Sequence, residues 1–578
     1  MSASRAPQSC QQCRRLKRKC TRELPFCSLC IRLGKACQYT QRSPHSASEN
    51  AGSIGTSIDS PEAGGALLLA RVQRLEGALL SGPSLSSLGS PGQVGHFGNG
   101  PGSRSSAASS AGDATPVGPG FGNPNKFPSE YFLDPDFFTP LSADALSLGT
   151  PPILSSCLLF LGMDLMPICH TYIATVSRSL SILSPKRLLQ DISAIRPSHP
   201  DPGFILVLCG IRLLSDTAYA GACAEYKLAK ALSSSAENEG IVSLRLIQGL
   251  VLLAVYELGH GLCPASYMTI GRAARMAMLM GLHDRQGAPQ LFKPADTWTA
   301  REEERRAWWA IFTLDRFCNI NTESLPLAVP EPSKTFLLPI NDLGWSQGDM
   351  GTAVPEPAAL VSSLTVSDSS AIGRFATTCQ AAHLVSHVLQ HRASARAAAR
   401  DVTPPPADDT LRIDEALQLH RTLVALDSRI ALGDAPGHDA NMEALALVCV
   451  ARMALYNLYG CNEPDVRSAP GRLRAEAEMQ RVSVQGVVEV GSGRAAGLAR
   501  GSPAGGRAVS PFVLACLYLA ATECAWFVRE GCGPDMRASL VAVVQALRVL
   551  RGSWGAAGTF LELLARDETV AEMFGDVS

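Results

Sequence analysis

The sequence lacks the features of secreted and membrane-spanning proteins. Its first residues, MSASRAPQSC, contain no apolar core of a signal peptide, so we expect its 18 cysteines in a reducing compartment and not in disulfides. No uncharged apolar run reaches about 18 residues, the length of a membrane span. The run from Phe512 to Val528 contains Glu523, and the run from Ile153 to Pro167 contains Asp164. We interpret both runs as buried helices and predict no membrane partner.

Sequence motifs of common enzyme classes are also missing. HExxH and GxSxG do not occur, and the 11 histidines are scattered along the chain. Gly491, Gly493 and Gly497 follow an apolar run, but their GxGxxxG spacing and the lack of alternating strands and helices argue against a dinucleotide site. We therefore predict that the chain is not an enzyme.

Charged residues are few and unevenly placed. They form 18% of the chain, and the formal net charge is −1. Residues 1–42, however, contain ten Lys or Arg and one Glu, a formal charge of +9, which leaves −10 on the remainder. A short, strongly basic segment attached to a mildly acidic body is typical of a tethered nucleic-acid-binding module.

A chain of 578 residues is too long for one hydrophobic core, since domains usually hold about 100–200 residues. We divide it into a cysteine-rich domain (1–43), a linker (44–130) and a large helical domain (131–578). The linker is rich in Ser, Gly and Pro and has too little apolar surface to offset the entropy of ordering, so we expect it to be disordered.

One segment of the linker, residues 66–80, has helical periodicity. Its apolar residues are spaced by 4, 3 and 4 positions, as in a coiled-coil seam: Leu68, Val72, Leu75 and Leu79. The segment is short and contains Gly77, which weakens a helix. It is therefore either a short dimerising coiled coil or a transient local helix.

The domain from residue 131 onward has apolar residues at helical spacing and few alternating runs, which predicts an all-α fold. Ile241–Leu258 is apolar nearly all round, as in a central helix, and Pro264–Gly281 begins and ends with helix-boundary residues. In Glu302–Phe317 we expect the acidic residues to occupy the first helical turn. Polar or Gly/Pro/Ala-rich stretches near 391–409 and 463–511 are predicted to be flexible insertions.

Six cysteines lie within 28 residues near the N-terminus: Cys10, Cys13, Cys20, Cys27, Cys30 and Cys37. Their intervals, x2-x6-x6-x2-x6, repeat one CxxC-x6-C unit twice. A zinc ion takes four tetrahedral ligands, so six thiolates satisfy two zinc ions only if two sulfurs bridge. By the pseudo-symmetry of the repeat, the bridging residues are Cys10 and Cys27. The alternative is one zinc with four cysteine ligands and two spare thiols.

Five cations lie between the second and third cysteines: Arg14, Arg15, Lys17, Arg18 and Lys19. Such a run is often a solvated helix face or a nuclear-localisation signal. Attached to a metal-fixed scaffold, it is better explained as a helix that enters the DNA major groove, because Lys and Arg reach guanine O6 and N7 and their neighbours contact phosphates.

The cysteine pattern resembles the fungal binuclear zinc cluster transcription factors, whose two CxxC-x6-C halves are joined by a loop that commonly holds a proline, here Pro25. The resemblance implies two zinc ions bridged by Cys10 and Cys27, and recognition of a CGG-type triplet by the first helix. Where a yeast member has two adjacent lysines, this chain has Leu16 and Lys17. Lys17 is expected to contact a base, and Leu16 departs from the pattern.

The resemblance extends to the helical region that often accompanies this cluster, here Met166 to Asn319. Two blocks carry it: YMTIGRAARMAMLMGLHD from Tyr267 to Asp284, and ERRAWW from Glu304, followed by Leu314-Asp315-Arg316. Four of these charged residues are expected to form ion pairs between helices, with an effector site as the alternative: Arg305, Arg306, Asp315 and Arg316. We expect Trp308 and Trp309 in the core, and His260 and His283 at helix ends.

These features together predict a zinc-dependent, sequence-specific transcription factor of the RNA polymerase II type. We expect a nuclear location, double-stranded DNA as ligand, a homodimer as one assembly, and the transcription machinery or co-regulators as partners. The resemblance suggests an activator of a metabolic or secondary-metabolite pathway. The alternatives are a repressor, a zinc-dependent protein-interaction adaptor, and an enzyme with a zinc-binding appendage.

The cysteine count generates a prediction about the metal. We expect a fragment of residues 1–45 to bind two zinc ions and to unfold when a strong chelator removes them, because its few apolar side chains cannot form an adequate core. Native mass spectrometry measures the zinc content, and circular dichroism follows unfolding. Saturation at a single zinc ion would contradict the bridged cluster.

Overall fold

In the computed structural model, the chain divides into two units, Met1–Phe121 and Gly122–Ser578. The described residues are Cys20, Arg22, Cys27 and Cys37 of the first unit and residues 152–575 of the second. The gaps within the second range are 163–164, 196–199, 216–222, 286, 288–291, 293–294, 321, 323–324, 334–335, 348–371, 401–405, 434–440, 461–469, 503–508 and 532–533.

The described part of the second unit is built from helices and contains no β-strand, which confirms the predicted all-α class. The helices of its first half are α5 (Pro152–Leu161), α6 (Leu165–Ala174), η2 (Val176–Arg178), α7 (Pro185–Ser193), α8 (Pro202–Ser215), α9 (Ala224–Asn238), α10 (Leu244–Gly259), α11 (Ala265–Leu279), α12 (Trp298–Cys318) and α13 (Asp342–Gln347). Those of its second half are α14 (Arg374–Arg400), α15 (Pro406–Gly433), α16 (Met442–Tyr459), α17 (Pro470–Glu489), η3 (Val490–Ala495), α18 (Ala496–Gly501), α19 (Pro511–Arg529), α20 (Pro534–Leu550), α21 (Gly555–Leu564) and α22 (Glu568–Phe574).

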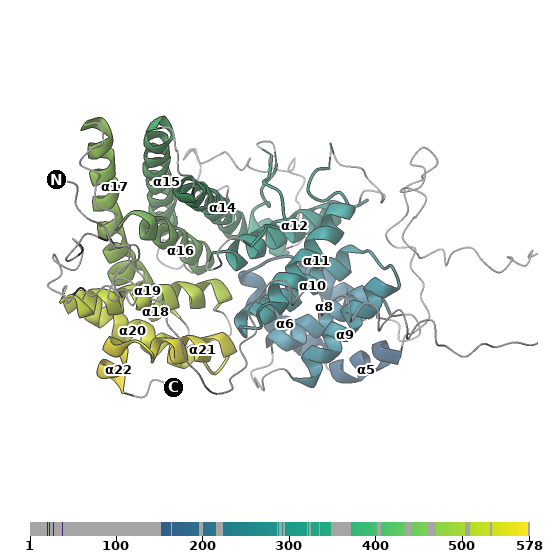
Figure 1. The fold of residues 1–578 in the computed structure, drawn as a ribbon. Helices are drawn as coiled ribbons and strands as arrows, with labels where there is room; N and C mark the ends of the chain where they lie inside the picture. Colours follow the sequence, from purple (N-terminus) through teal and green to yellow (C-terminus); the bar gives the residue numbers. More distant parts are fainter. Residues whose placement is uncertain are drawn as a thin grey trace, which may run out of the picture. The chain divides into compact units, whose positions relative to one another are not determined.

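Two buried helices organise this unit (Figure 1). In the first half, α10 packs against α8, α11 and α12, and in the second half α16 packs against α14, α15, α17 and α19. Contacts from α12 to α14 and from α10 to α19 and α21 join the halves. The buried apolar side chains form one continuous cluster that extends from Leu154 to Val570.

Local sequence signals set the helix ends. The Ser243 hydroxyl accepts from the Leu246 amide (3.1 Å) at the start of α10, and the Thr297 hydroxyl accepts from the Ala300 amide (3.2 Å) at the start of α12. Gly281, with φ of 69°, ends α11 in the left-handed region that glycine tolerates best. The expected helices at Ile241–Leu258 and Pro264–Gly281 are therefore confirmed as α10 and α11 with slightly shorter bounds.

The helices α16 and α19 are long and apolar enough to cross a membrane, by length and composition alone. A third candidate is the pair α5 and α6 taken together, which bends by 75° at its break. Two thirds of the window in both α16 and α19 is buried inside the protein, and α16 is packed by other helices along its length. This burial favours the interpretation of α16 and α19 as core helices.

The structure contradicts most of the two predicted insertions. Near 391–409, α14 continues to Arg400 and α15 begins at Pro406, since the segment is rich in helix-forming Ala and Arg and buried His391 anchors it to Glu415 and Tyr459. Near 463–511, residues 470–501 are helical throughout the glycine-rich stretch. Gly491 lies in the π-helical turn η3, where an added Cβ would come within 3.1 Å of the Cys524 sulfur.

The start of α12 also differs from the expectation. The helix begins at Trp298, four residues before Glu302, so the acidic residues lie in its second turn and not in the first. Glu302, Glu303 and Glu304 are buried, with exposures of 1%, 0% and 9%. Ion pairs, and not the helix dipole, therefore account for their position: Glu302 pairs within α12, and Glu303 and Glu304 pair with other segments.

The contact between Gly259 and Trp554 generates a stability prediction. A Cβ at Gly259 would lie 2.0 Å from two ring carbons of Trp554, whose indole is buried and donates to the Val509 carbonyl (2.8 Å). Gly259→Ala should therefore lower the free energy of unfolding by about 1–3 kcal/mol, as overpacking does. Denaturant unfolding measures the loss.

Gly271→Ala on α11 is the matched control, because nothing lies within 4 Å of a Cβ added there. Removing a glycine from a helix interior should raise stability by about 0.5–1 kcal/mol. Equal effects of the two substitutions would contradict the proposed role of the Gly259–Trp554 contact.

Candidate metal centre and charged block

The described cysteines of the first unit are suited to a thiolate metal centre. Cys20, Cys27 and Cys37 are buried, with exposures of 8%, 0% and 7%. The Cys27 amide donates to the Cys37 sulfur at 3.3 Å, so the first and last cysteines of the second half-motif lie together. A backbone N–H directed at sulfur favours the ionised thiolate, which is the form that binds zinc. The donor type, thiolate sulfur, fits zinc.

The remaining residues of this candidate site lie outside the described part of the chain. They are Cys10, Cys13, Cys30, the five cations Arg14, Arg15, Lys17, Arg18 and Lys19, and the segment 66–80. Of the basic segment's surroundings, the structure describes Arg22, which is exposed and has φ of 60°. Within the described residues, no group of three His, Cys, Asp or Glu is placed to hold a metal. The ligand set therefore stays a prediction.

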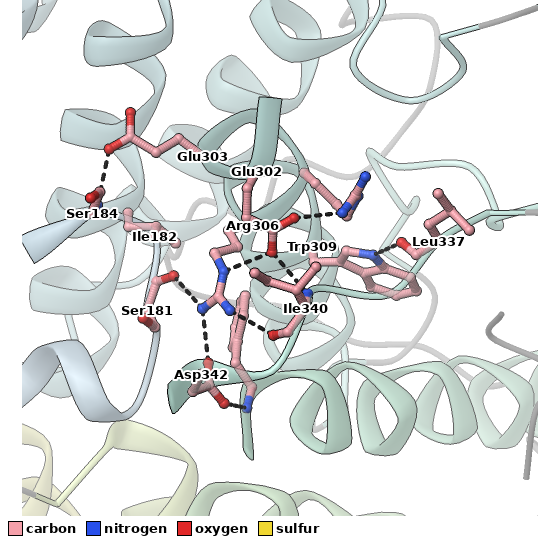
Figure 2. Close-up of polar contacts among 12 residues, drawn as sticks. Ser181, Ile182, Ser184, Glu302, Glu303, Arg306, Trp309, Leu337, Ile340 and Asp342 are labelled. Carbon is pink, nitrogen blue, oxygen red and sulfur yellow. Dashed lines mark hydrogen bonds and ion pairs between the residues drawn. The ribbon is translucent and has the colours of Figure 1, made fainter. Parts of the chain in front are cut away.

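The second candidate site is the charged block of α12, centred on Arg306 (Figure 2). Arg306 is fully buried, and its guanidinium donates to Glu302 Oε1 (2.9 Å), Asp342 Oδ1 (2.9 Å) and the carbonyls of Ser181 (3.1 Å) and Ile340 (2.8 Å). The rings of Trp345 and Phe375 lie 4.6 and 5.6 Å from the guanidinium carbon. Four of the five N–H donors of Arg306 therefore have acceptors within the protein.

The acidic residues of the block fix two further segments to α12. Glu302 also accepts from the Ile340 amide (2.9 Å) and pairs with Arg305 (2.5 Å). Glu303 accepts from the Ser184 amide (2.9 Å) and from Arg187 (3.0 Å) at the start of α7. The segments at 181–187 and 340–342 are thus held by the same helical turns.

A second group of ion pairs lies at the C-terminal end of α12. Asp315 accepts from the amides of Ala328 (3.1 Å) and Val329 (3.3 Å), and Arg316 bonds to Asp315 (2.6 Å) and Glu331 (2.8 Å). Burial raises the pKa of Asp315, and these donors oppose the rise.

The pKa of the Glu331 carboxyl shifts in the opposite direction to that of Asp315. Although burial acts to raise its pKa, hydrogen bonds from Ser386 and Arg316 hold the pKa of Glu331 below its ordinary value. The charged end of α12 thereby binds both the loop 328–331 and α14.

These contacts test several of the predictions that the sequence made for the helical domain. Arg305, Arg306, Asp315 and Arg316 all form ion pairs, as predicted, but among the described residues only Arg306 forms one with another helix, through Asp342 of α13. Arg305 and Asp315 pair within α12, and Arg316 pairs with Asp315 and with Glu331 of a loop. Trp308 and Trp309 are core residues, with exposures of 2% and 0%, as expected.

His260 caps the end of α10, as predicted, whereas His283 lies in the turn that follows α11 and its C-cap residue Met280. His260 Nδ1 accepts from the Gly555 amide (3.0 Å), and burial lowers the pKa of His260 to about 4. Burial also lowers the pKa of His283. Both side chains are therefore neutral residues of the helix packing near pH 7.

A third buried network was not identified from the sequence. Arg452 in α16 is fully buried and bonds to Asp427 (2.8 Å) on α15, Glu489 (2.7 Å) on α17 and the Tyr456 hydroxyl (3.0 Å). The signal available in the sequence was an arginine inside an otherwise apolar helix, which implies a buried partner. Its partners are distant in sequence and could not be named.

Comparison with known families identifies both regions. Residues 8–46 match the fungal Zn(2)-Cys(6) binuclear cluster domain, and residues 187–353 match the fungal specific transcription factor domain. The chain contains a fungal Zn(2)-Cys(6) cluster domain and a fungal specific transcription factor domain. Neither family is an enzyme family, which agrees with the sequence expectation. The charged block of α12 lies within the second match.

Relatives with similar segments carry names from transcriptional regulation. Transcription factor BOA15 of Botryotinia fuckeliana is 40% identical over 81 residues, 14% of this chain and 45% of that protein. Pigment biosynthesis transcriptional activator pigB of Monascus ruber is 28% identical over 156 residues, 26% of this chain and 27% of that protein. Citrinin biosynthesis transcriptional activator ctnR of Monascus purpureus is 26% identical over 147 residues, 25% of each chain.

The chain spans less than half the length of each of these relatives. No solved structure is a significant match.

The Arg306 network generates a second stability prediction. Arg306→Met should lower the free energy of unfolding by about 3–5 kcal/mol, because it removes the buried cation shared by Glu302 and Asp342 and leaves Glu302 with Arg305 alone. The control is Arg301→Met on the same helix, where the exposed side chain bonds to the Ala295 carbonyl (2.9 Å). That change should cost at most about 1 kcal/mol. Denaturant unfolding of both variants compares them, and similar losses would show that Arg306 has no special role.

Proposed function

We propose that this zinc cluster protein binds specific DNA sequences and regulates RNA polymerase II transcription. The observation that carries the proposal is the six-cysteine, double CxxC-x6-C segment with its basic run, matched by the cluster domain at residues 8–46. The match to the transcription factor domain supports it independently. A nuclear location follows from this activity.

The proposed DNA-binding head holds two zinc ions through Cys10, Cys13, Cys20, Cys27, Cys30 and Cys37, with Cys10 and Cys27 as the bridging ligands. Zinc cross-links the segment and supplies the stability that its few apolar side chains cannot. The chain's own residues then provide recognition: the cations between Cys13 and Cys20 face the DNA. Lys17 contacts a base of a CGG-type triplet, and Arg14, Arg15, Arg18 and Lys19 contact phosphates.

The proposed biological role is activation of a biosynthetic gene cluster. It is supported by the names of two relatives, which are a pigment biosynthesis transcriptional activator and a citrinin biosynthesis transcriptional activator. A homodimer through residues 66–80, reading paired triplets, and contacts of the helical domain with co-regulators complete the proposal. Repression of the same genes and a zinc-dependent adaptor role are the competing functions.

Selection from a pool of random duplexes tests DNA recognition directly. The zinc-loaded full-length chain and a fragment of residues 1–80 should both enrich one motif that contains a CGG-type triplet. An adaptor would enrich none, and enrichment of an unrelated motif would refute only the triplet assignment.

Salt titrations of single variants test the assigned contacts. Lys17→Ala should lose about 1–3 kcal/mol on the enriched site and little on scrambled DNA, because it removes a base contact. Arg15→Ala should weaken both duplexes equally and reduce the log–log salt slope by about 0.9, since it removes one phosphate contact. If Lys17→Ala weakens both duplexes equally, another residue of the basic run reads the base.

A further inference from the structure

Two cysteines of the helical domain meet at one serine. Cys263 lies in the short loop between α10 and α11, Ser266 in the first turn of α11, and Cys318 is the last residue of α12. The Ser266 hydroxyl lies 3.5 Å from the Cys263 sulfur and 3.8 Å from the Cys318 sulfur. The two thiols thus lie against the same hydroxyl.

Access to solvent distinguishes this pair from the other thiols. Cys263 is exposed, Cys318 is partly buried, and seven further described cysteines of the helical domain are buried: Cys157, Cys169, Cys209, Cys379, Cys449, Cys516 and Cys524. Cys223 is also partly accessible but lies against the Tyr256 hydroxyl (3.6 Å) and has no thiol neighbour among its described contacts. An exposed sulfur beside a protected one is the arrangement of a reacting and a resolving thiol.

We propose that Cys263 and Cys318 form an oxidisable dithiol site whose substrate is a hydroperoxide. The Cys263 thiolate attacks the outer peroxide oxygen, the O–O bond breaks, and Cys263 becomes a sulfenic acid while water or an alcohol leaves. The Cys318 thiol then attacks the Cys263 sulfur, the S–O bond breaks, and the hydroxyl leaves with the Cys318 proton as water. The peroxide gains the two electrons that the two thiols lose as they become the disulfide.

Ser266 is the positioning residue of the second step. Burial raises the pKa of the Cys318 thiol to about 11, and Asp315 and Glu257 act in the same direction, whereas the hydrogen bond with Ser266 lowers it. The hydroxyl therefore favours the nucleophilic thiolate at the sulfur that closes the bond. Cys263 lies outside the helix, two residues before the first residue of α11, Ala265.

The bond would tie the start of α11 to the end of α12. That end already holds the loop at Ala328 through Asp315, and it holds Arg392 of α14 through the Asn319 carbonyl (2.9 Å). Oxidation at this site would thus constrain the end of α12, where the two halves of the helical unit meet.

Peptide mapping of the zinc-loaded full-length chain after treatment with hydrogen peroxide tests the site. The untreated and treated proteins should differ by one Cys263–Cys318 cross-linked peptide, about 2 Da lighter than the two thiol peptides and restored by dithiothreitol. In Cys318→Ser the sulfenic acid of Cys263 has no second thiol with which to form the disulfide, so dimedone should label Cys263. In Cys263→Ser neither product should form.

Two further variants separate this site from general oxidation. Cys223→Ser should leave the cross-link unchanged, and Ser266→Ala should leave the first oxidation unchanged but slow closure several-fold, with dimedone labelling of Cys263 rising accordingly. Because products are read peptide by peptide, oxidation of the zinc cluster does not obscure the result. A link from Cys263 to any other cysteine, or oxidation of Cys223 before Cys263, would overturn the proposal.

Discussion

A guanidinium group that leaves water loses several kcal/mol of hydration unless protein atoms replace its hydrogen bonds. Arg306, Arg316 and Arg452 are buried to 1% exposure or less in the helical unit. Each meets carboxylates from another helix or loop as well as its own surroundings. A helix that shifted would leave such a charge buried and unpaired, so these arginines fix the loops and the neighbouring helices in one arrangement.

The need to pair buried charges also explains why the ERRAWW block of the helical domain stabilises the fold and does not form a binding site. The run from Glu304 to Trp309 lies within the matched family region, yet its charged groups are occupied by one another and by backbone carbonyls. The buried Arg306 guanidinium already bonds to the carboxylates of Glu302 and Asp342. The block therefore identifies the fold, and the proposed DNA contacts belong to the separate, basic N-terminal unit.

The two units depend on different sources of stability. The helical unit has one continuous apolar core from Leu154 to Val570, whereas the cysteine-rich segment has few sizeable apolar residues and relies on its thiolates. The charge distribution follows the same division, with +9 on residues 1–42 and −10 on the rest.

The sequence by itself determined the helical class, the helices α10 and α11 and the zinc-binding cysteine pattern, because periodicity, capping residues and thiol spacing are local signals. It predicted insertions near 391–409 and 463–511 where the structure has helix, since it could not show that His391 and Gly491 have buried partners. Only the tertiary structure decided which carboxylates meet Arg306 and Arg452, and that Cys263 and Cys318 share Ser266. Those partners lie far apart in sequence, and burial, which makes an unpaired charge costly, exists only once the helices pack.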